Sequence, residues 1–163
     1  PGHSPMAGGP DVVSDEGPLE RALKCKERGN KHLVAKDSAG ALKWYKEGIA
    51  ALEGECLASG GPEILAIAVT LHANSAQAFL RQRKWLECID ASNTALRFDP
   101  ASMKAAWRGA TAAIEAGMHD VAVAFVEGGL AEVPNCSELL ELRARLGPLP
   151  EGPPAAPPGG DSD

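Results

Sequence analysis

Five side chains of this chain could bind an anion, and four of them form two pairs at helical spacing. They are Lys26, Asn30, Asn74, Lys104 and Arg108. Residues four apart lie on the same face of an α-helix, so Lys26 pairs with Asn30. Lys104 pairs with Arg108 in the same way. Ammonium, guanidinium and amide nitrogens all donate hydrogen bonds, and a ligand with two carboxylates would accept them. A C-terminal Asp or Glu is such a ligand, because it presents a side-chain and a main-chain carboxylate together.

The elements that must position these residues repeat with a period of 34 residues. Small residues hold three fixed places in three successive units: Gly29, Ala76 and Ala110; Ala41, Cys88 and Ala122; Gly48, Ala95 and Gly129. The second step in each series is 34 residues, and the first is 47 because 13 residues are inserted between units one and two. Pro100 and Pro134 are also 34 residues apart, and Asn74 and Arg108 hold one repeat place. Such a period is typical of stacked two-helix repeats.

Helix-end signals divide the chain in the same way. We expect units at about 22–55, 69–102 and 103–136, an insertion near 54–66 and a capping helix over 137–146. Asp37 or Ser38 should cap the second helix of unit one, and Asp120 that of unit three. Asp99 and Pro100 should begin unit three, with the proline at the first helical position. The insertion should either lengthen the connection as a loop or add turns to the flanking helices.

The predicted fold class is all-α, a superhelical stack of three helix pairs plus a C-terminal capping helix, over residues 19–146. Segments rich in Pro and Gly flank this domain. Residues 1–18 contain four Pro and four Gly, and we expect a disordered lead-in or a cloning remnant. Residues 147–163 contain six Pro and four Gly, which predicts a disordered tail.

Composition argues against several classes of function. The net charge of −6 weighs against nucleic acid as a partner, and no run of 18 apolar residues could span a membrane. Cys25, Cys56, Cys88 and Cys136 are scattered without a CxxC pair, so we expect reduced thiols of a cytoplasmic protein, with no metal site. No histidine lies in a Ser or Cys nucleophile motif, and no Gly-rich phosphate loop occurs. We therefore expect neither an enzyme nor a cofactor.

The segments around the five residues resemble a known family. KERGNK at 26–31, LHANSAQAF around Asn74 and KAAWR at 104–108 look like the dicarboxylate clamp of chaperone-binding tetratricopeptide-repeat (TPR) domains. That family includes the Hsp-organising protein, the TPR immunophilins and the UNC-45-type myosin chaperones. It has Lys and Asn in the first helix of unit one, Asn in that of unit two, and Lys and Arg in that of unit three. The segments RGATAAIEAG, EGGL and SELLELRARL also resemble the subgroup around tetratricopeptide-repeat protein four.

The resemblance implies a role for each of the five residues. Lys26, Asn30 and Asn74 would hold the terminal carboxylate of the ligand. Lys104 and Arg108 would hold a side-chain carboxylate. The ligand would be the C-terminal tail of heat-shock protein 90 and/or heat-shock protein 70, ending in EEVD, and the chain would be a co-chaperone adaptor.

Three further residues are weaker candidates for ligand contact. His72 and Phe79 belong to the first helix of unit two, and Trp107 adjoins Arg108. Each of the three is alternatively a packing residue. Ser75 departs from the family, which usually has Arg at this place, but it lies outside the five-residue set.

Two other functions stay open at this point. The chain could be a scaffold whose concave face binds an internal segment of an unrelated protein. It could also be a regulatory fragment of a larger enzyme, with the repeats as the targeting module. Dependence on a free C-terminal carboxylate separates the adaptor from the scaffold, because only the five-residue site requires that group.

Overall fold

The computed structural model describes residues 16–148, without the side chains of Glu55 and Cys56, and these residues form eight helices. The helices are α1 (Pro18–Val34), α2 (Ser38–Leu52), α3 (Glu55–Ser59), α4 (Pro62–Arg81), α5 (Trp85–Phe98), α6 (Met103–Glu115), α7 (His119–Glu132) and α8 (Ser137–Leu146). Most of the predicted lead-in at 1–18 and of the predicted tail at 147–163 lies outside the described residues.

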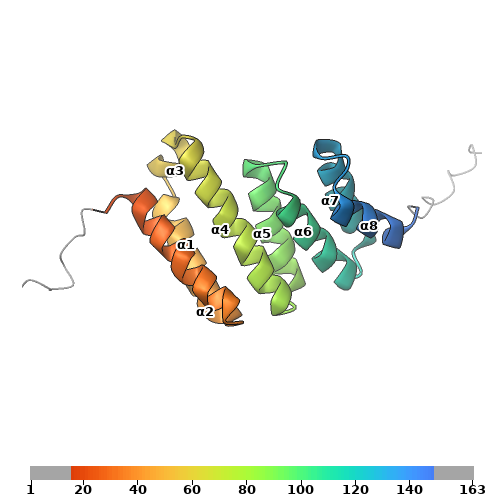
Figure 1. The fold of residues 1–163 in the computed structure, drawn as a ribbon, viewed down its shortest axis with the longest axis horizontal. Coiled ribbons are helices and arrows are strands. Elements are labelled where there is room, and N and C mark those ends of the chain that lie inside the picture. The colour runs from red at the N-terminus through yellow and green to blue at the C-terminus, as the bar shows by residue number, and fades with distance from the viewer. Residues whose placement is uncertain (1–15, 149–163) are drawn as a thin grey trace, which may run out of the picture.

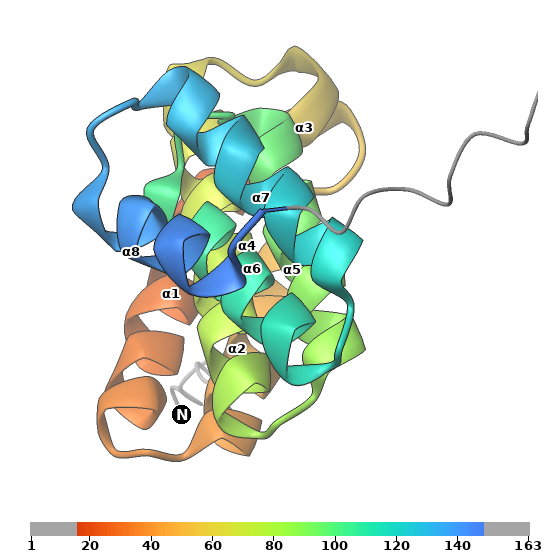
Figure 2. The same cartoon turned by 90° about the vertical axis from the view of Figure 1, so that its right-hand side faces the viewer.

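The helices stack side by side along one axis (Figure 1). α1 pairs with α2, α4 with α5 and α6 with α7, while α8 packs against α6 and α7. The first helices of the pairs also contact one another, α1 with α4 and α4 with α6. Figure 2 shows α7 and α8 at the C-terminal end of the stack. The prediction of an all-α stack of three helix pairs with a capping helix is confirmed, and α8 spans the range expected for the cap.

The small residues of the 34-residue period lie where helices approach most closely. A Cβ atom on Gly29 would sit 2.4 Å from Cε1 of Tyr45, and one on Gly129 would sit 2.4 Å from Cδ1 of Leu139. The alanines at equivalent places, such as Ala110, are fully buried. The period is therefore a packing requirement, because interiors at close-packed density leave no room for a larger side chain at these places.

The 13-residue insertion mainly adds helix. α4 begins at Pro62 and runs for 20 residues, whereas α6 has 13. The short helix α3 occupies the connection before α4 and lies beside the beginning of α4 (Figure 1). Of the two expectations for the insertion, added helical turns describe it better than a plain loop. No helix of residues 16–148 is long and apolar enough to cross a membrane.

The predicted cap of unit one is confirmed. Asp37 is the N-cap of α2, and its Oδ1 accepts a hydrogen bond from the backbone N–H of Gly40 at 2.9 Å. The predicted cap of unit three is wrong. Asp120 lies inside the first turn of α7, after the N-cap residue Met118. There it interacts favourably with the positive end of the helix dipole without capping a backbone N–H.

The prediction that Asp99 and Pro100 begin the first helix of unit three is also wrong. α6 begins at Met103, so Pro100 is not its first residue. Asp99 instead follows α5, and its Oδ1 accepts from the backbone N–H of Ala101 at 3.0 Å. An Asp that bonds the backbone two residues ahead stabilises a turn, and Asp followed by Pro fits a turn as well as a helix start. The sequence signal was real, but it marked the turn before the helix.

Candidate functional site

Two of the five predicted residues contact each other directly. Nδ2 of Asn74 on α4 donates a hydrogen bond to Oδ1 of Asn30 on α1 at 3.0 Å. The hydroxyl of Tyr45 on α2 donates to the same Oδ1 at 2.6 Å. These two bonds occupy both lone pairs of the Asn30 oxygen and fix the orientation of its amide. The Nδ2 group of Asn30 makes no hydrogen bond within residues 16–148, so it remains available as a donor.

Arg108, on α6, contacts the backbone beside this amide pair. Its Nη1 donates to the backbone carbonyl of Ala73 at 2.6 Å, next to Asn74. Burial lowers the pKa of Arg108, and the nearby groups that act against that shift are the Cys88 thiol and the Tyr45 hydroxyl. Neither group is negatively charged at neutral pH, because burial raises the pKa of the Cys88 thiol to about 11 and that of the Tyr45 hydroxyl to about 12. A buried cation without an acidic partner is costly, so this position favours an incoming anion.

The two predicted lysines lie on the same helix faces as Asn30 and Arg108. Lys26 lies one turn before Asn30 on α1 and is half-buried. Lys104 lies one turn before Arg108 on α6 and is exposed. Lys104, Trp107 and Arg108 line a cavity of about 230 Å³. We call the side of α1, α4 and α6 that carries the five predicted residues the A surface.

The cations of the A surface have no acidic partners in the described part of the chain. The ion pairs there join Lys24 to Glu16, His32 to Asp37 and Arg143 to Glu127. None of them involves Lys26, Lys104 or Arg108. The A surface therefore combines unpaired positive charge with oriented amide donors, which is the chemistry that binds carboxylates.

The polar face of the A surface continues beyond the five predicted residues. Arg81 lies seven residues after Asn74, and Thr111 lies seven after Lys104, so each shares a helix face with its predecessor. Nη1 of Arg81 donates to the backbone carbonyl of Leu33, at the end of α1, at 2.5 Å. Oγ1 of Thr111 is buried without a hydrogen-bond partner among the described residues. Arg81 and Thr111 were not among the residues predicted from the sequence, although the seven-residue spacing places them on these helix faces.

No protein-family model matches the chain, but several solved structures have the same fold. The Hsp90 co-chaperone Cns1 from Saccharomyces cerevisiae matches with a TM-score of 0.70 and 23% identity over 81% of this chain. This chain spans 40% of the Cns1 chain, which is less than half of its length. The second TPR domain of human RPAP3, solved with the Hsp70 peptide SGPTIEEVD, matches with a TM-score of 0.67. That match has 25% identity and covers 80% of this chain and 98% of the RPAP3 domain.

The chain has the fold of a TPR domain. A further match is the second TPR domain of Spaghetti (RPAP3), bound to the HSP90 peptide SRMEEVD, with a TM-score of 0.57 and 28% identity. It covers 69% of this chain and 93% of the Spaghetti domain. These domains share with this chain the stacked helix pairs that the 34-residue period predicted.

The three weaker candidates occupy different places in this TPR domain. The ring of His72 stacks on that of Phe98 in α5, with centroids 6.0 Å apart. His72 is two residues from Asn74 and so points to nearly the opposite side of α4, where burial lowers its pKa. Phe79 packs against a core cluster that is built from residues of α4, α5, α6, α7 and α8. Trp107 alone lines the cavity of the A surface, so the positions of His72 and Phe79 favour the packing interpretation.

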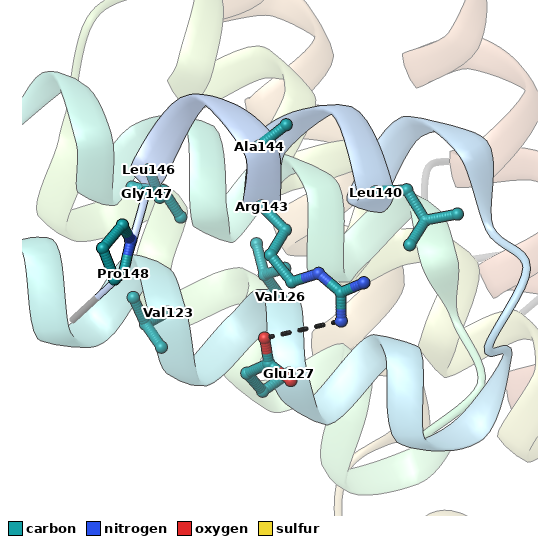
Figure 3. A pocket seen from close by; sticks show the side chains of 9 residues that line it. All are labelled: Val123, Val126, Glu127, Leu140, Arg143, Ala144, Leu146, Gly147 and Pro148. Atoms are coloured by element: carbon teal, nitrogen blue, oxygen red, sulfur yellow. Dashed lines mark ion pairs between the residues drawn. The ribbon is translucent and has the colours of Figure 1, made fainter.

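A larger cavity, of about 590 Å³, lies between α7 and α8 at the C-terminal end of the TPR domain (Figure 3). Its lining is mainly aliphatic, including Val123, Val126 and Leu140. The Glu127 carboxylate and the Arg143 guanidinium pair across it at 4.0 Å. None of the five predicted residues lines this cavity, and its one cation is already paired. It therefore lacks the anion-binding chemistry of the A surface.

Proposed function

We propose that this TPR domain is a cytoplasmic co-chaperone adaptor, and not an enzyme, that binds free protein C-termini of the EEVD type. The ligands are the tails of heat-shock protein 90 and/or heat-shock protein 70. The observation that carries the proposal is the hydrogen-bonded pair of Asn30 and Asn74, which lies beside the unpaired and partly buried Arg108. Because these residues come from three different helices, the stacked fold is needed to bring them together.

Each carboxylate of the terminal residue has its own donors in this proposal. Lys26, Asn30 and Asn74 bind the main-chain carboxylate. Lys104 and Arg108 bind a side-chain carboxylate. The guanidinium of Arg108 is held in place by its bond to the backbone of Ala73, so little side-chain entropy is lost when the ligand binds.

The expected affinity is modest. A hydrogen bond to a charged group contributes about 1.5–3 kcal/mol, but a short peptide loses conformational freedom when it is ordered. We expect a dissociation constant near 1 μM, which corresponds to about −8 kcal/mol. Two solved structures with the same fold hold peptides that end in EEVD, which supports this choice of ligand class.

Titration calorimetry with the peptide SRMEEVD tests the proposal directly. The free acid should bind with a micromolar dissociation constant, and the same peptide with a C-terminal amide should bind at least about tenfold more weakly. Arg108→Ala should weaken binding of the free acid by about ten- to a hundredfold. Arg97→Ala removes an exposed cation of α5 and serves as the matched control, with no change expected.

Equal binding of the free acid and the amide would contradict the proposal. That result would favour the alternative of a TPR scaffold that binds an internal segment of a partner. Binding of neither peptide would leave the fold without this ligand class.

A further inference from the structure

The turns within units one and two lie at the same edge of the stack, the lower edge in both views (Figure 1, Figure 2). The first turn connects α1 to α2, and the second connects α4 to α5. A hydrogen bond from Nη1 of Arg81 to the backbone carbonyl of Leu33, at 2.5 Å, joins the two turns directly. We call residues 31–37 and 81–87 the turn edge. The bond between its two halves holds them together as one surface.

Positive charge collects on the turn edge, although the whole chain has a net charge of −6. The edge carries the carboxylates of Asp37 and Glu87 and five exposed cations, which are Lys31, Lys36, Arg81, Arg83 and Lys84. None of the five cations forms an ion pair among residues 16–148. The Asp37 carboxylate is already engaged by His32 and by the backbone N–H of Gly40. The turn edge therefore presents unpaired positive charge to its surroundings.

Two of these cations occupy a backbone position that favours glycine. The three turns within the repeats share one geometry, in which a residue with positive φ donates its N–H to the carbonyl three residues earlier. That residue is Lys36 in unit one (φ 63°), Arg83 in unit two (φ 59°) and Gly117 in unit three (φ 73°). Side chains disfavour this left-handed conformation, so glycine is the usual residue there. Units one and two thus keep a cation where the backbone alone would favour glycine, and such strain often marks a functional surface.

The third turn has the opposite character. It contains Glu115 and Asp120 and no Lys or Arg, and its residue with positive φ is the glycine. The positive charge is therefore confined to the turns of units one and two. A general preference of such turns for cations does not explain this difference between the units.

Apolar side chains protrude beside the cations. Three large hydrophobic side chains are exposed among residues 16–148, and two of them, Val34 and Leu86, belong to the turn edge. Val34 is the last residue of α1 and is 83% exposed. The guanidinium of Arg83 lies over the ring of Trp85, 5.6 Å from its centroid. Because Val34 protrudes instead of lining a groove, it can be buried only by a partner into which it inserts.

We propose that the turn edge is a docking surface for an anionic membrane, to which the domain binds peripherally. The cations lie at the level of the lipid headgroups, and Val34 and Leu86 enter the boundary with the acyl chains. An acidic protein segment would also attract the cations, but it would need a matching pocket for each protruding side chain. A lipid surface accepts cations and protruding aliphatic groups together. The inference does not rest on the proposed function, because none of the five residues of that site takes part.

Co-sedimentation of the full chain with lipid vesicles tests the proposal. Vesicles of phosphatidylcholine with about 30% phosphatidylserine should bind the protein, and vesicles of phosphatidylcholine alone should not. Binding should weaken as the salt concentration rises from about 0.05 M to about 0.3 M, because salt screens exposed charges.

The double variant Lys36→Gly, Arg83→Gly separates membrane binding from folding. Each Lys or Arg near an anionic surface strengthens binding by about fivefold, so this variant should bind the anionic vesicles at least about tenfold more weakly. Its melting temperature should stay the same or rise, because glycine adopts the left-handed conformation without strain. Arg143→Gln, Arg145→Gln removes the same charge from exposed positions of α8. This matched control should bind the vesicles as wild type does.

Val34→Ser tests the apolar part of the surface. It should weaken binding to the anionic vesicles by about fivefold and leave the salt dependence unchanged, because the charges are retained. Unchanged binding of this variant would show that no side chain inserts at Val34, which would overturn the membrane as the occupant.

Three further results would overturn the proposal. The first is equal binding of wild type to the two kinds of vesicle, or binding to neither. The second is an equal loss of binding in the α8 control, because net charge alone would then account for the effect. The third is binding to soluble poly-glutamate without binding to anionic vesicles, which would assign the turn edge to an acidic protein segment instead.

Discussion

At the scale of single residues, the orientation of one amide decides whether the A surface has a donor to offer. Asn30 alone could present either its oxygen or its nitrogen to a ligand. Tyr45 and Asn74 both donate to its oxygen, so its nitrogen is the group left for an anion. Burial raises the pKa of Tyr45 to about 12, and the hydroxyl therefore keeps its proton and remains a donor well above neutral pH.

Tyr45→Phe should separate this orienting role from packing. The ring is fully buried and is retained in the variant, so the fold should persist with only a small loss of stability. Loss of the hydrogen bond to Asn30 should weaken binding of SRMEEVD by about fivefold, equivalent to about 1 kcal/mol. Calorimetry measures the affinity, and thermal denaturation checks the fold. Unchanged affinity would show that Asn74 alone orients Asn30.

At the scale of helices, glycine has two different roles in this chain. Gly29 lies where α1 meets the ring of Tyr45, so the space for a side chain is already filled. Gly128 lies on α7, and an added Cβ there would meet nothing within 4 Å. The intrinsic helix propensity of Ala over Gly favours substitution equally at both positions, by about 1 kcal/mol. Packing must therefore reverse the sign at one position and not at the other.

Gly29→Ala and Gly128→Ala form a matched pair that tests this argument. Gly29→Ala should destabilise the domain by about 1–3 kcal/mol, because Tyr45 must shift. It should also weaken peptide binding, since Tyr45 positions Asn30. Gly128→Ala should stabilise the domain by about 0.5–1 kcal/mol without changing the affinity. Urea denaturation followed by circular dichroism measures both effects, and equal stabilisation by the two substitutions would refute the steric account.

At the scale of the whole molecule, the stack has an end that must be covered. In a repeat protein each unit contacts only its neighbours, so the last pair would expose apolar surface without a cap. α8 provides the cover. Leu139 is fully buried against Gly129, and Leu142 is almost fully buried. The five predicted residues of the A surface lie on α1, α4 and α6, and of the α8 residues only Glu138 lines their cavity, so the cap should act on stability more than on ligand affinity.

Leu139→Ala should destabilise the domain by about 2–5 kcal/mol, because it removes a fully buried side chain and leaves a cavity. Leu86→Ala is the control, since Leu86 is 64% exposed, and it should change stability by less than about 0.5 kcal/mol. Thermal denaturation measures both. At a temperature where Leu139→Ala remains folded, its affinity for SRMEEVD should match that of wild type. A large loss of affinity there would mean that α8 also shapes the A surface.

Some features of the structure could be predicted from the sequence alone, and others could not. The 34-residue period predicted the helix pairs, because close helix packing imposes small residues at fixed places. The capping helix was predicted separately, because the open end of such a stack needs a cover. Local signals were weaker, and the turn at Asp99 looked like a helix start because the same residue types favour both. The five anion-binding residues stay a prediction until a ligand is measured, although the contact between Asn30 and Asn74 places two of them together.

By itself, the sequence determined which residues share a helix face, since a period of 3.6 residues is a local property of the chain. It could not determine which helix faces meet. The bonds from Tyr45 to Asn30, from Arg108 to the backbone of Ala73 and from Arg81 to that of Leu33 join residues 15, 35 and 48 positions apart. Such contacts depend on how the helices stack, which the side chains of all the repeats decide together. Only the tertiary structure therefore showed that Asn30 is held as a donor and that Arg81 is bonded to the end of α1.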